Sequence, residues 1–212
     1  MSLAITGCPP TFIVMTDWQE RYLQGDTPWD KGRPAPPLEE LIGRLGPGLF
    51  GDEEVWVPGC GAGHDVRLLA SHGLRVLGLD LAPAALDAAR SHAAVNDERY
   101  ELMDFLDAGQ REGREAGAIW EHTCYCAIDP SRRADYARSC AELLAPGRVL
   151  AGVFFLRPWD EGEEHQGPPF GAMIESIDAC FSPWFERLEA WVPLLGYPGR
   201  EGREWLAVYK RL

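Results

Sequence analysis

Three glycines within five residues, directly after a short apolar run, constrain the fold of this chain more than any other feature. Residues 55–57 read VWV and residues 58–65 read PGCGAGHD. A strand, a glycine-rich turn and a helix in this order let the backbone approach a ligand, because glycine has no side chain in the way. In parallel α/β sheets such a turn lies at the carboxyl ends of the strands, where ligands bind. The stretch therefore predicts a ligand site beside Gly59 and Gly61.

The rest of the chain alternates β-like and helix-like segments, as a doubly wound, mostly parallel sheet with helices on both faces requires. The expected strands are 55–58, 75–80, 100–103, 118–126 and 149–156, with two late strands near 185–192 and 204–210. The expected helices are 62–72, one that begins at Pro83, one from about 129 to 146, and one near 171–180. Residues 157–170 are polar and rich in proline and glycine, which predicts a long loop. No linker or repeat divides the 212 residues, so we expect a single domain.

An acidic residue at the second strand narrows the choice of ligand. Asp80 ends that strand about 20 residues after Gly59, a spacing at which a carboxylate can bind ribose hydroxyls. The glycine spacing is GxGxG through Gly63, and His64 stands where a dinucleotide fingerprint has its third glycine. Asp65 in the first helical turn would also repel a pyrophosphate. The pattern favours S-adenosylmethionine (SAM) over a nicotinamide or flavin cofactor; a tight turn without any ligand is the alternative.

The charge and cysteine content exclude several classes of partner. Twenty basic residues against 33 acidic ones give a formal charge of −13, whereas phosphate backbones and anionic membranes are bound by basic faces. We therefore expect neither a nucleic-acid nor a membrane partner. The six cysteines form no CxxC pair, which favours reduced thiols in a cytoplasmic protein. Nothing in the sequence demands more than a monomer.

Two further stretches fit a methyltransferase. Asp104 and Phe105 follow the third strand, where many methyltransferases place an acidic and an apolar residue beside the adenine; a helix cap is the alternative for Asp104. The stretch LLAPGRVL at 143–150 resembles the LLKPGG that precedes the fifth strand in many SAM methyltransferases. Arg148 replaces the second glycine, so this match is partial.

Several stretches together resemble one known family. DWQERYLQGDTPWDKGR at 17–33, VPGCGAGHD at 57–65, LGLD at 77–80, CAIDPSRR at 126–133 and GPPF at 167–170 occur in the order found in the thiopurine S-methyltransferase family. The branch that the chain most resembles contains the plant-type thiol, thiocyanate and halide methyltransferases. The resemblance runs from about Trp18 to about Phe170, and TPWDxGR is its most specific part.

The resemblance implies a Rossmann-like class I methyltransferase fold with a seven-stranded sheet and an N-terminal lid, here about residues 15–35, over the SAM site. Together with the glycine loop it gives these expected cofactor contacts: Trp18, Tyr22, Trp29, Gly59, Gly61, Asp80, Asp104, Phe105 and His122. The faces of Trp18 and Trp29 would attract the sulfonium by a cation–π interaction; anchoring of the N-terminal segment is the alternative. Tyr22 and His122 depart from the plant members, which tend to have tryptophan and tyrosine there, so the acceptor preference stays open.

Other candidate residues have simpler explanations beside the functional ones. His122, Cys124 and Cys126 alternate along the expected strand 118–126, so they should point to the same face, but a structural zinc site needs a fourth ligand, so no metal is expected. Cys60 at a helix start could have a lowered pKa, yet no histidine at motif spacing pairs with it. Arg157 is a candidate anion contact and Phe170 a candidate wall of the acceptor pocket; a surface salt bridge and core packing are the alternatives.

The expected activity is methyl transfer from SAM to a small soft nucleophile, first of all a thiol, with thiocyanate, hydrosulfide, halides and thiopurines as further acceptors. Such nucleophiles arrive largely charged, so positioning suffices and no essential catalytic residue is expected. An alcohol or phenol acceptor would need a base, for which His122 or His165 would serve. An O-methyltransferase, a nicotinamide-dependent oxidoreductase and a noncatalytic SAM sensor are the alternatives.

Overall fold

The protein is described by a computed structural model for residues 16–160 and 167–212. Seven strands form one sheet in the order β3-β2-β1-β4-β5-β7-β6. The strands are β1 (Val55–Pro58), β2 (Val76–Asp80), β3 (Arg99–Leu102), β4 (Ala116–His122), β5 (Leu144–Phe155), β6 (Phe185–Trp191) and β7 (Glu204–Arg211). β1 to β5 pair in parallel, and β7 is antiparallel to both β5 and β6. The expected α/β sheet is confirmed.

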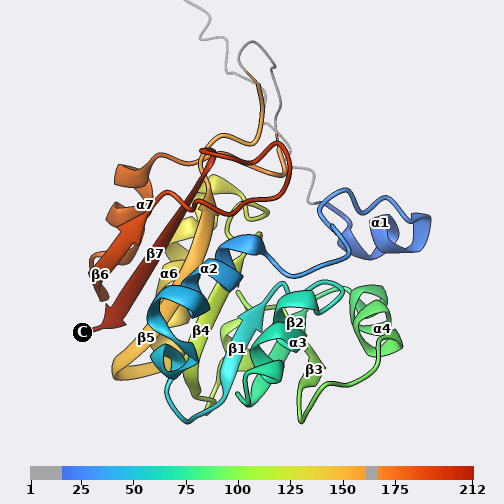
Figure 1. Ribbon diagram of the computed structural model, residues 1–212, viewed down its shortest axis with the longest axis horizontal. Coiled ribbons are helices and arrows are strands. Elements are labelled where there is room, and N and C mark those ends of the chain that lie inside the picture. The colour runs from blue at the N-terminus through green and yellow to red at the C-terminus, as the bar shows by residue number, and fades with distance from the viewer. Residues whose placement is uncertain (1–15, 161–166) are drawn as a thin grey trace, which may run out of the picture.

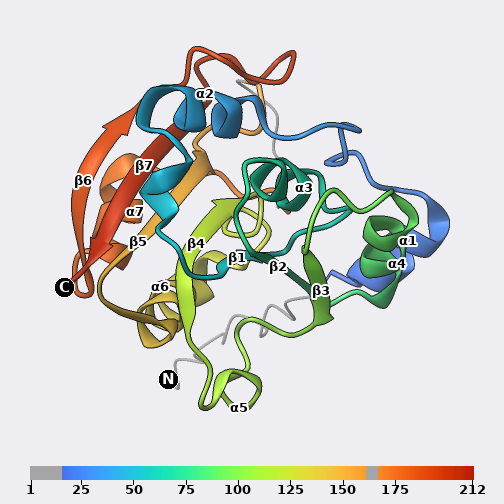
Figure 2. The same ribbon diagram turned by 60° about the horizontal axis from the view of Figure 1, so that its bottom comes forward.

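The helices are α1 (Trp18–Gln24), α2 (Pro36–Leu45), α3 (His64–Ser71), α4 (Pro83–Ser91), α5 (Ala108–Arg111), α6 (Arg133–Leu143) and α7 (Ile174–Phe181). Short 3-10 helices occupy Pro47–Phe50 and Pro130–Arg132. α1 lies beside α4 at one end of the sheet, while β6 and β7 form the other end (Figures 1 and 2). None of the helices described here is long and apolar enough to cross a membrane.

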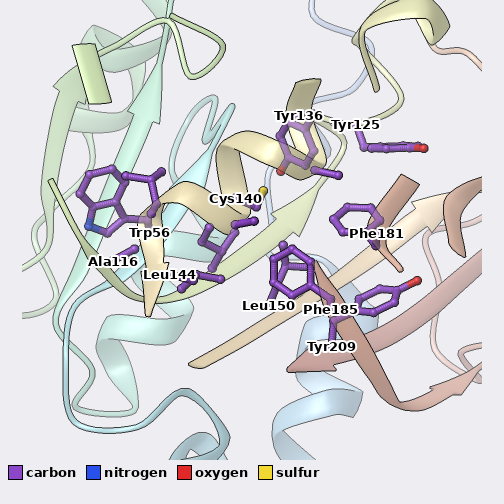
Figure 3. Packing of buried hydrophobic residues seen from close by; sticks show 14 of the residues in the cluster. Trp56, Ala116, Tyr125, Tyr136, Cys140, Leu144, Leu150, Phe181, Phe185 and Tyr209 are labelled. Carbon is purple, nitrogen blue, oxygen red and sulfur yellow. The ribbon is translucent and has the colours of Figure 1, made fainter. Parts of the chain in front are cut away.

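The alternation of side chains along the central strands builds one core on each face of the sheet. Val55 and Val57 of β1 point to the face that α2 and α3 cover, where Leu41 and Leu69 pack against them. Trp56 points to the opposite face, toward the core that α6 and α7 cover (Figure 3). Both faces of β1 are therefore buried. This burial fixes the position of the strand and, with it, the position of the glycine loop that follows.

The chain reverses its direction of travel across the sheet between β1 and β4. After β1 it adds β2 and β3 on one side, and β4 then pairs with the other side of β1. A crevice forms at the carboxyl ends of the strands at such a point, because the two following connections lead away from each other. At this edge, Gly59 follows β1, while Asp80 is the last residue of β2 and His122 the last residue of β4.

The expected fourth strand was wrong in its extent. β4 ends at His122, and Thr123 has a φ of 63°. A β-branched residue in the left-handed region cannot continue a strand. Cys124 and Cys126 therefore lie in a turn. The expectation that they share a strand face with His122 was wrong. Residues 1–15 and 161–166, which include His165 and part of the expected loop 157–170, lie outside the described residues.

Candidate active site

A cavity of about 550 Å³ opens at the carboxyl ends of β1, β2 and β4. This volume is within the range of roughly 300–1,000 Å³ that is usual for small-molecule sites. The wall includes seven of the expected cofactor contacts: Trp18, Tyr22, Trp29, Gly59, Gly61, Asp80 and His122. Further parts of the wall come from the loop after β5, with Trp159 and Pro168, and from the loop between β6 and β7, with Tyr197 and Arg200.

The glycine loop is tight because side chains of the protein also need its space. Gly59 and Gly61 have φ values of 62° and 53°, which strain any residue with a side chain. A Cβ at Gly59 would lie 3.0 Å from Cys124 Cβ, and one at Gly61 would lie 2.9 Å from Tyr22 Oη. Glycine at these two positions therefore leaves room for the Cys124 and Tyr22 side chains and lets a ligand approach the backbone.

Asp80 is held at the edge of this loop by backbone donors. Its Oδ2 accepts a hydrogen bond from Gly61 N at 3.0 Å, and its Oδ1 accepts one from Ala82 N at 2.9 Å. Burial raises the pKa of Asp80, against the lowering effect of these hydrogen bonds. Each carboxylate oxygen has a second lone pair, so the group can still accept hydrogen bonds from a pair of ribose hydroxyls.

Aromatic side chains of the N-terminal segment contact one another at the cavity wall. Trp29 lies edge-on to Trp18, with ring centroids 5.2 Å apart, and to Tyr22, with centroids 5.6 Å apart. The guanidinium carbon of Arg21 lies 4.4 Å from the centroid of the Trp29 ring. The Arg21 guanidinium therefore already forms a cation–π interaction with Trp29.

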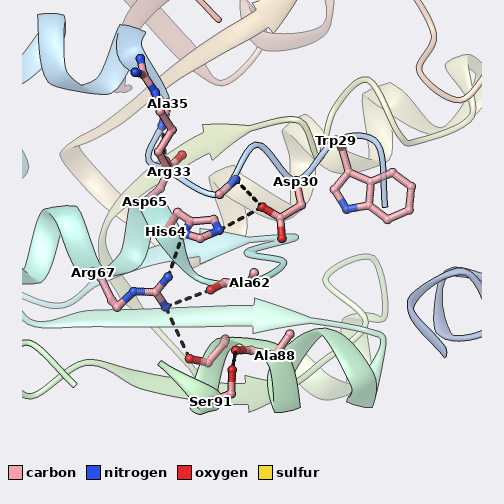
Figure 4. A network of polar contacts seen from close by, with 12 residues as sticks. Trp29, Asp30, Arg33, Ala35, Ala62, His64, Asp65, Arg67, Ala88 and Ser91 are labelled. Atoms are coloured by element: carbon pink, nitrogen blue, oxygen red, sulfur yellow. Dashed lines mark hydrogen bonds and ion pairs between the residues drawn. The ribbon is translucent and has the colours of Figure 1, made fainter. Parts of the chain in front are cut away.

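Hydrogen bonds tie residues 16–35 to the domain at separate points. The Gln19 side chain accepts from Ala84 N at 2.8 Å, at the start of α4. Asp30 Oδ1 lies 3.0 Å from His64 Nε2, and His64 Nδ1 in turn lies 2.9 Å from a guanidinium nitrogen of Arg67 (Figure 4). An arginine can only donate, so His64 Nδ1 accepts and Nε2 donates to Asp30. The segment is therefore fastened across the glycine loop.

Asp65, in the first turn of α3, joins this segment to β4. Its Oδ1 accepts from Ala35 N at 2.7 Å, and its Oδ2 accepts from Trp120 Nε1 at 2.8 Å and lies 2.9 Å from His122 Nδ1. Burial would raise the pKa of Asp65, but His122 and the hydrogen bonds from Ala35 and Trp120 outweigh burial and lower it. The sequence interpretation missed this role. Local patterns gave no signal for it, because Asp65 and His122 are 57 positions apart and the first turn of a helix already explains an acidic residue.

The other ring nitrogen of His122 is buried without a partner. Nε2 has no hydrogen bond from residues 16–160 or 167–212. Leaving a buried polar atom unpaired costs about 1–3 kcal/mol, which a ligand with a hydrogen bond to offer would remove. Tyr197 stacks on the His122 ring at a centroid distance of 6.1 Å, and its hydroxyl donates to Arg33 O at 2.8 Å. The N-terminal segment, β4 and the β6–β7 loop thus meet at His122.

Four of the expected site residues lie away from this wall. Phe105 is buried in the core against Tyr136, with centroids 5.3 Å apart, and Asp104 Oδ1 accepts from Leu106 N. Arg157 lines a second, more open cavity beside α7 and donates to Gly202 O at 2.9 Å. Phe170 N donates to Cys126 O at 2.7 Å.

The cysteines of the site are protonated thiols packed as small apolar groups. Burial, followed by the nearby Asp80, raises the pKa of Cys60 well above its ordinary value, contrary to the lowering that a helix start could give. Burial likewise raises the pKa of Cys124 and that of Cys126, the latter to about 12. Among the described residues no group of three His, Cys, Asp or Glu side chains is placed to hold a metal ion.

Comparison with known proteins identifies the family. The sequence profile of the thiopurine S-methyltransferase (TPMT) family matches residues 14–191. The chain belongs to the thiopurine S-methyltransferase family. It is 29% identical over 212 residues to thiocyanate methyltransferase 1 of Brassica oleracea, covering 96% of this chain and 88% of that protein. It is 28% identical over 190 residues to the thiopurine S-methyltransferase of Pseudomonas fluorescens, covering 82% and 85%.

The fold agrees with this assignment. The N-methyltransferase NodS of Bradyrhizobium japonicum, solved with S-adenosylhomocysteine, superposes with a TM-score of 0.65 over 91% of this chain and 96% of that one, at 19% identity. As a member of the thiopurine S-methyltransferase family, the chain is a SAM-dependent methyltransferase. Its own residues fit SAM: the glycine loop leaves the backbone bare, Asp80 has free lone pairs, and the rings of Trp18, Tyr22 and Trp29 line the wall.

Proposed function

We propose that this enzyme methylates a small soft nucleophile, first of all a thiol, in the cavity between the N-terminal segment and the carboxyl ends of β1, β2 and β4. The observation that carries the proposal is the convergence of the glycine loop, Asp80 and the Trp18–Trp29 pair on one cavity. The names of the relatives, a thiocyanate and a thiopurine S-methyltransferase, support a soft acceptor.

Within this proposal the expected site residues have the following roles. Asp80 binds the ribose hydroxyls, and the backbone at Gly59 and Gly61 contacts the cofactor. Trp18, Tyr22 and Trp29 cover it, so that residues of about 15–35 act as a lid on a single domain. Asp104 and Phe105 flank the adenine, although they do not line the cavity of this structure. His122 lies on the acceptor side, with Arg157 and Phe170 as outer contacts.

The chemistry needs alignment and exclusion of water more than it needs charge. SAM supplies a methyl group that its sulfonium has already activated for displacement. The chain holds the acceptor in line with that methyl group, which accounts for most of the rate gain in such a reaction. The fastening of the segment by Gln19, Asp30 and Ala35 keeps the cavity closed on the lid side during the transfer.

Titration calorimetry with S-adenosylhomocysteine tests the cofactor site. Asp80→Ala removes the ribose contact together with the hydrogen bonds from Gly61 and Ala82, and we expect the dissociation constant to rise at least 100-fold. Asp87→Ala is the matched control, because Asp87 is exposed on the neighbouring helix α4. Binding that is unaffected by Asp80→Ala would remove the proposal.

An acceptor screen with SAM tests the acceptor class. It should cover thiols, hydrosulfide, thiocyanate, halides, thiopurines and phenols, with methyl transfer followed by mass. We expect the thiols to give the highest kcat/KM. Nε2 of His122, which has no hydrogen-bond partner within the described ranges, favours a second candidate, O-methylation of a small hydroxyl compound, since such an acceptor needs a base. Phenols turned over faster than every thiol would decide for that candidate.

The setting of the enzyme is a further part of the proposal. The described cysteines Cys60, Cys124, Cys126, Cys140 and Cys180 are free thiols, which suits a reducing cytoplasm. We propose a monomer acting on a small molecule, which sedimentation of the purified protein at micromolar concentration would test.

A further inference from the structure

The hydrogen bond between His122 and Asp65 assigns the protons of the imidazole. Asp65 is an acceptor, because its carboxylate already receives hydrogen bonds from Ala35 N and from Trp120 Nε1. His122 Nδ1, at 2.9 Å from Asp65 Oδ2, must therefore be the donor. In the neutral ring this leaves a lone pair on Nε2, the nitrogen that has no partner in the described chain.

The surroundings hold this ring in place. Trp120 and His122 project from the same face of β4 and share one carboxylate oxygen, so the ring cannot turn without breaking the contact with Asp65. The next residue, Thr123, has a left-handed backbone at a φ of 63°, and its hydroxyl donates to His122 O at 2.7 Å. Strained backbone of this kind occurs where the surrounding structure fixes a functional group.

We propose that His122 is the general base of the methyl transfer, that Asp65 orients it, and that the enzyme therefore accepts thiols that arrive with their proton. The S–H bond of the acceptor breaks and its proton goes to His122 Nε2. The electron pair of the S–H bond forms the new sulfur–methyl bond. The bond between the methyl group and the donor sulfonium breaks at the same time, and its electron pair stays on the donor sulfur. His122 then releases its proton to solvent, and the Asp65 carboxylate balances the charge in between.

The charged and titratable groups around His122 are few. Asp65 faces it from α3, and Tyr197 stacks on it from the β6–β7 loop. Glu121, its neighbour on β4, is buried on the opposite face of the sheet. Arg33 and Arg200 lie against the Tyr197 ring, at 5.8 and 5.3 Å from its centroid. Of these groups, Asp65 is the one that is hydrogen-bonded to the imidazole in the described part of the chain.

The inference rests on the proposed function and narrows its substrate class. A nucleophile that is already an anion needs no base, whereas an aliphatic thiol is mostly protonated near neutral pH. A general base speeds a proton transfer by typically 10²–10⁴-fold. His122 should therefore matter for aliphatic thiols and be nearly silent for thiolates that are ionised before they bind.

The test compares two thiols in the same enzyme. His122→Asn keeps an amide donor near the position of Nδ1 but deletes Nε2. We expect it to lower kcat/KM for 2-mercaptoethanol about 100-fold at pH 7 and that for the ionised 4-nitrothiophenol less than threefold. Raising the pH to 9.5 should restore the 2-mercaptoethanol rate of the variant, since the acceptor then ionises by itself. His72→Asn, an exposed histidine after α3, is the matched control.

Two results would overturn the inference: an equal loss of rate for both thiols, or a loss for 2-mercaptoethanol that high pH does not restore. If His122→Asn does not fold, His122→Gln tested with the same two thiols serves instead. Asp65→Asn should lower the 2-mercaptoethanol rate more than the 4-nitrothiophenol rate, since it acts through the ring. A wild-type enzyme that methylates neither thiol would contradict the proposed function itself, which is a different outcome.

Discussion

The indole N–H of Trp29 donates a hydrogen bond to Tyr22 Oη at 3.0 Å, and the same oxygen is the atom that a Cβ at Gly61 would meet at 2.9 Å. The N-terminal segment and the glycine loop are thus fitted to each other through one phenol group. Burial raises the pKa of Tyr22, so this group keeps its proton across the range of ordinary assays.

We expect Gly61→Ala to raise the dissociation constant for S-adenosylhomocysteine at least tenfold. The new Cβ strains a backbone at a φ of 53° and displaces Tyr22 from Trp29; the left-handed backbone alone costs an alanine about 1–2 kcal/mol. Tyr22→Phe by itself should raise the constant about fivefold through the lost hydrogen bond. Calorimetry on the double variant tests whether the two effects are coupled. Removal of the Tyr22 oxygen relieves the clash with the new Cβ, so the dissociation constant should rise by less than the product of the two single effects. Additive effects would contradict this coupling.

Cofactor binding by the N-terminal segment should also depend on Asp30, which connects the segment to α3. Asp30 accepts from His64, which accepts from Arg67, whose other guanidinium nitrogen donates to Ala62 O at 2.9 Å. Asp30→Ala removes the first link, and we expect about a fivefold weaker binding of S-adenosylhomocysteine, since one hydrogen bond contributes about 1 kcal/mol. Asp97→Ala on the exposed loop before β3 is the control. The Asp30 variant should keep its unfolding midpoint in urea, and a large fall there would show that the contact supports the fold instead.

Several features of the site could be predicted from the sequence because they depend on local rules. The bounds of β1 were predicted correctly, and Asp80 was placed at the end of β2 from its spacing to Gly59. The contact between Asp65 and His122 could not be predicted in this way. It joins residues 57 positions apart, and the acid had a sufficient local explanation in the first turn of a helix.

The end of β4 was missed for a related reason. The apolar residues after His122 continue the pattern of a buried strand, so periodicity gave no sign of a stop. Thr123 stops it through a backbone conformation that threonine disfavours. α2 was missed as well, although Pro36 and Pro37 at its first positions fit a helix start.

Thr123 leads to a prediction of its own. Asparagine tolerates the left-handed region better than a β-branched residue does, so Thr123→Asn should raise the free energy of unfolding by about 1 kcal/mol. Urea unfolding would measure this, with Thr27→Asn in the N-terminal segment as the control. Lower stability of the Thr123 variant would mean that the hydrogen bond from its hydroxyl to His122 O outweighs the strain.

Glu121 makes the stability of the enzyme depend on pH. It is fully buried, its carboxylate accepts hydrogen bonds from Tyr125 N at 2.7 Å and from the Tyr136 hydroxyl, and burial raises its pKa to about 7. An ordinary glutamate in the unfolded chain titrates at about 4.3. Between these values the folded state binds more protons than the unfolded state, so the stability that Glu121 contributes is complete below about pH 4 and is lost as the pH rises through 7.

Glu121→Gln should remove this pH dependence. The amide has the shape of the protonated acid and can accept from Tyr125 N and donate to the Tyr136 oxygen. Urea unfolding at pH 5, 6.5 and 8 should show that the wild type loses up to about 3 kcal/mol more than the variant over this range. Glu39→Gln, on the exposed side of α2, should follow the wild type. Parallel curves for the wild type and Glu121→Gln would mean that the folded protein holds this carboxyl at an ordinary pKa.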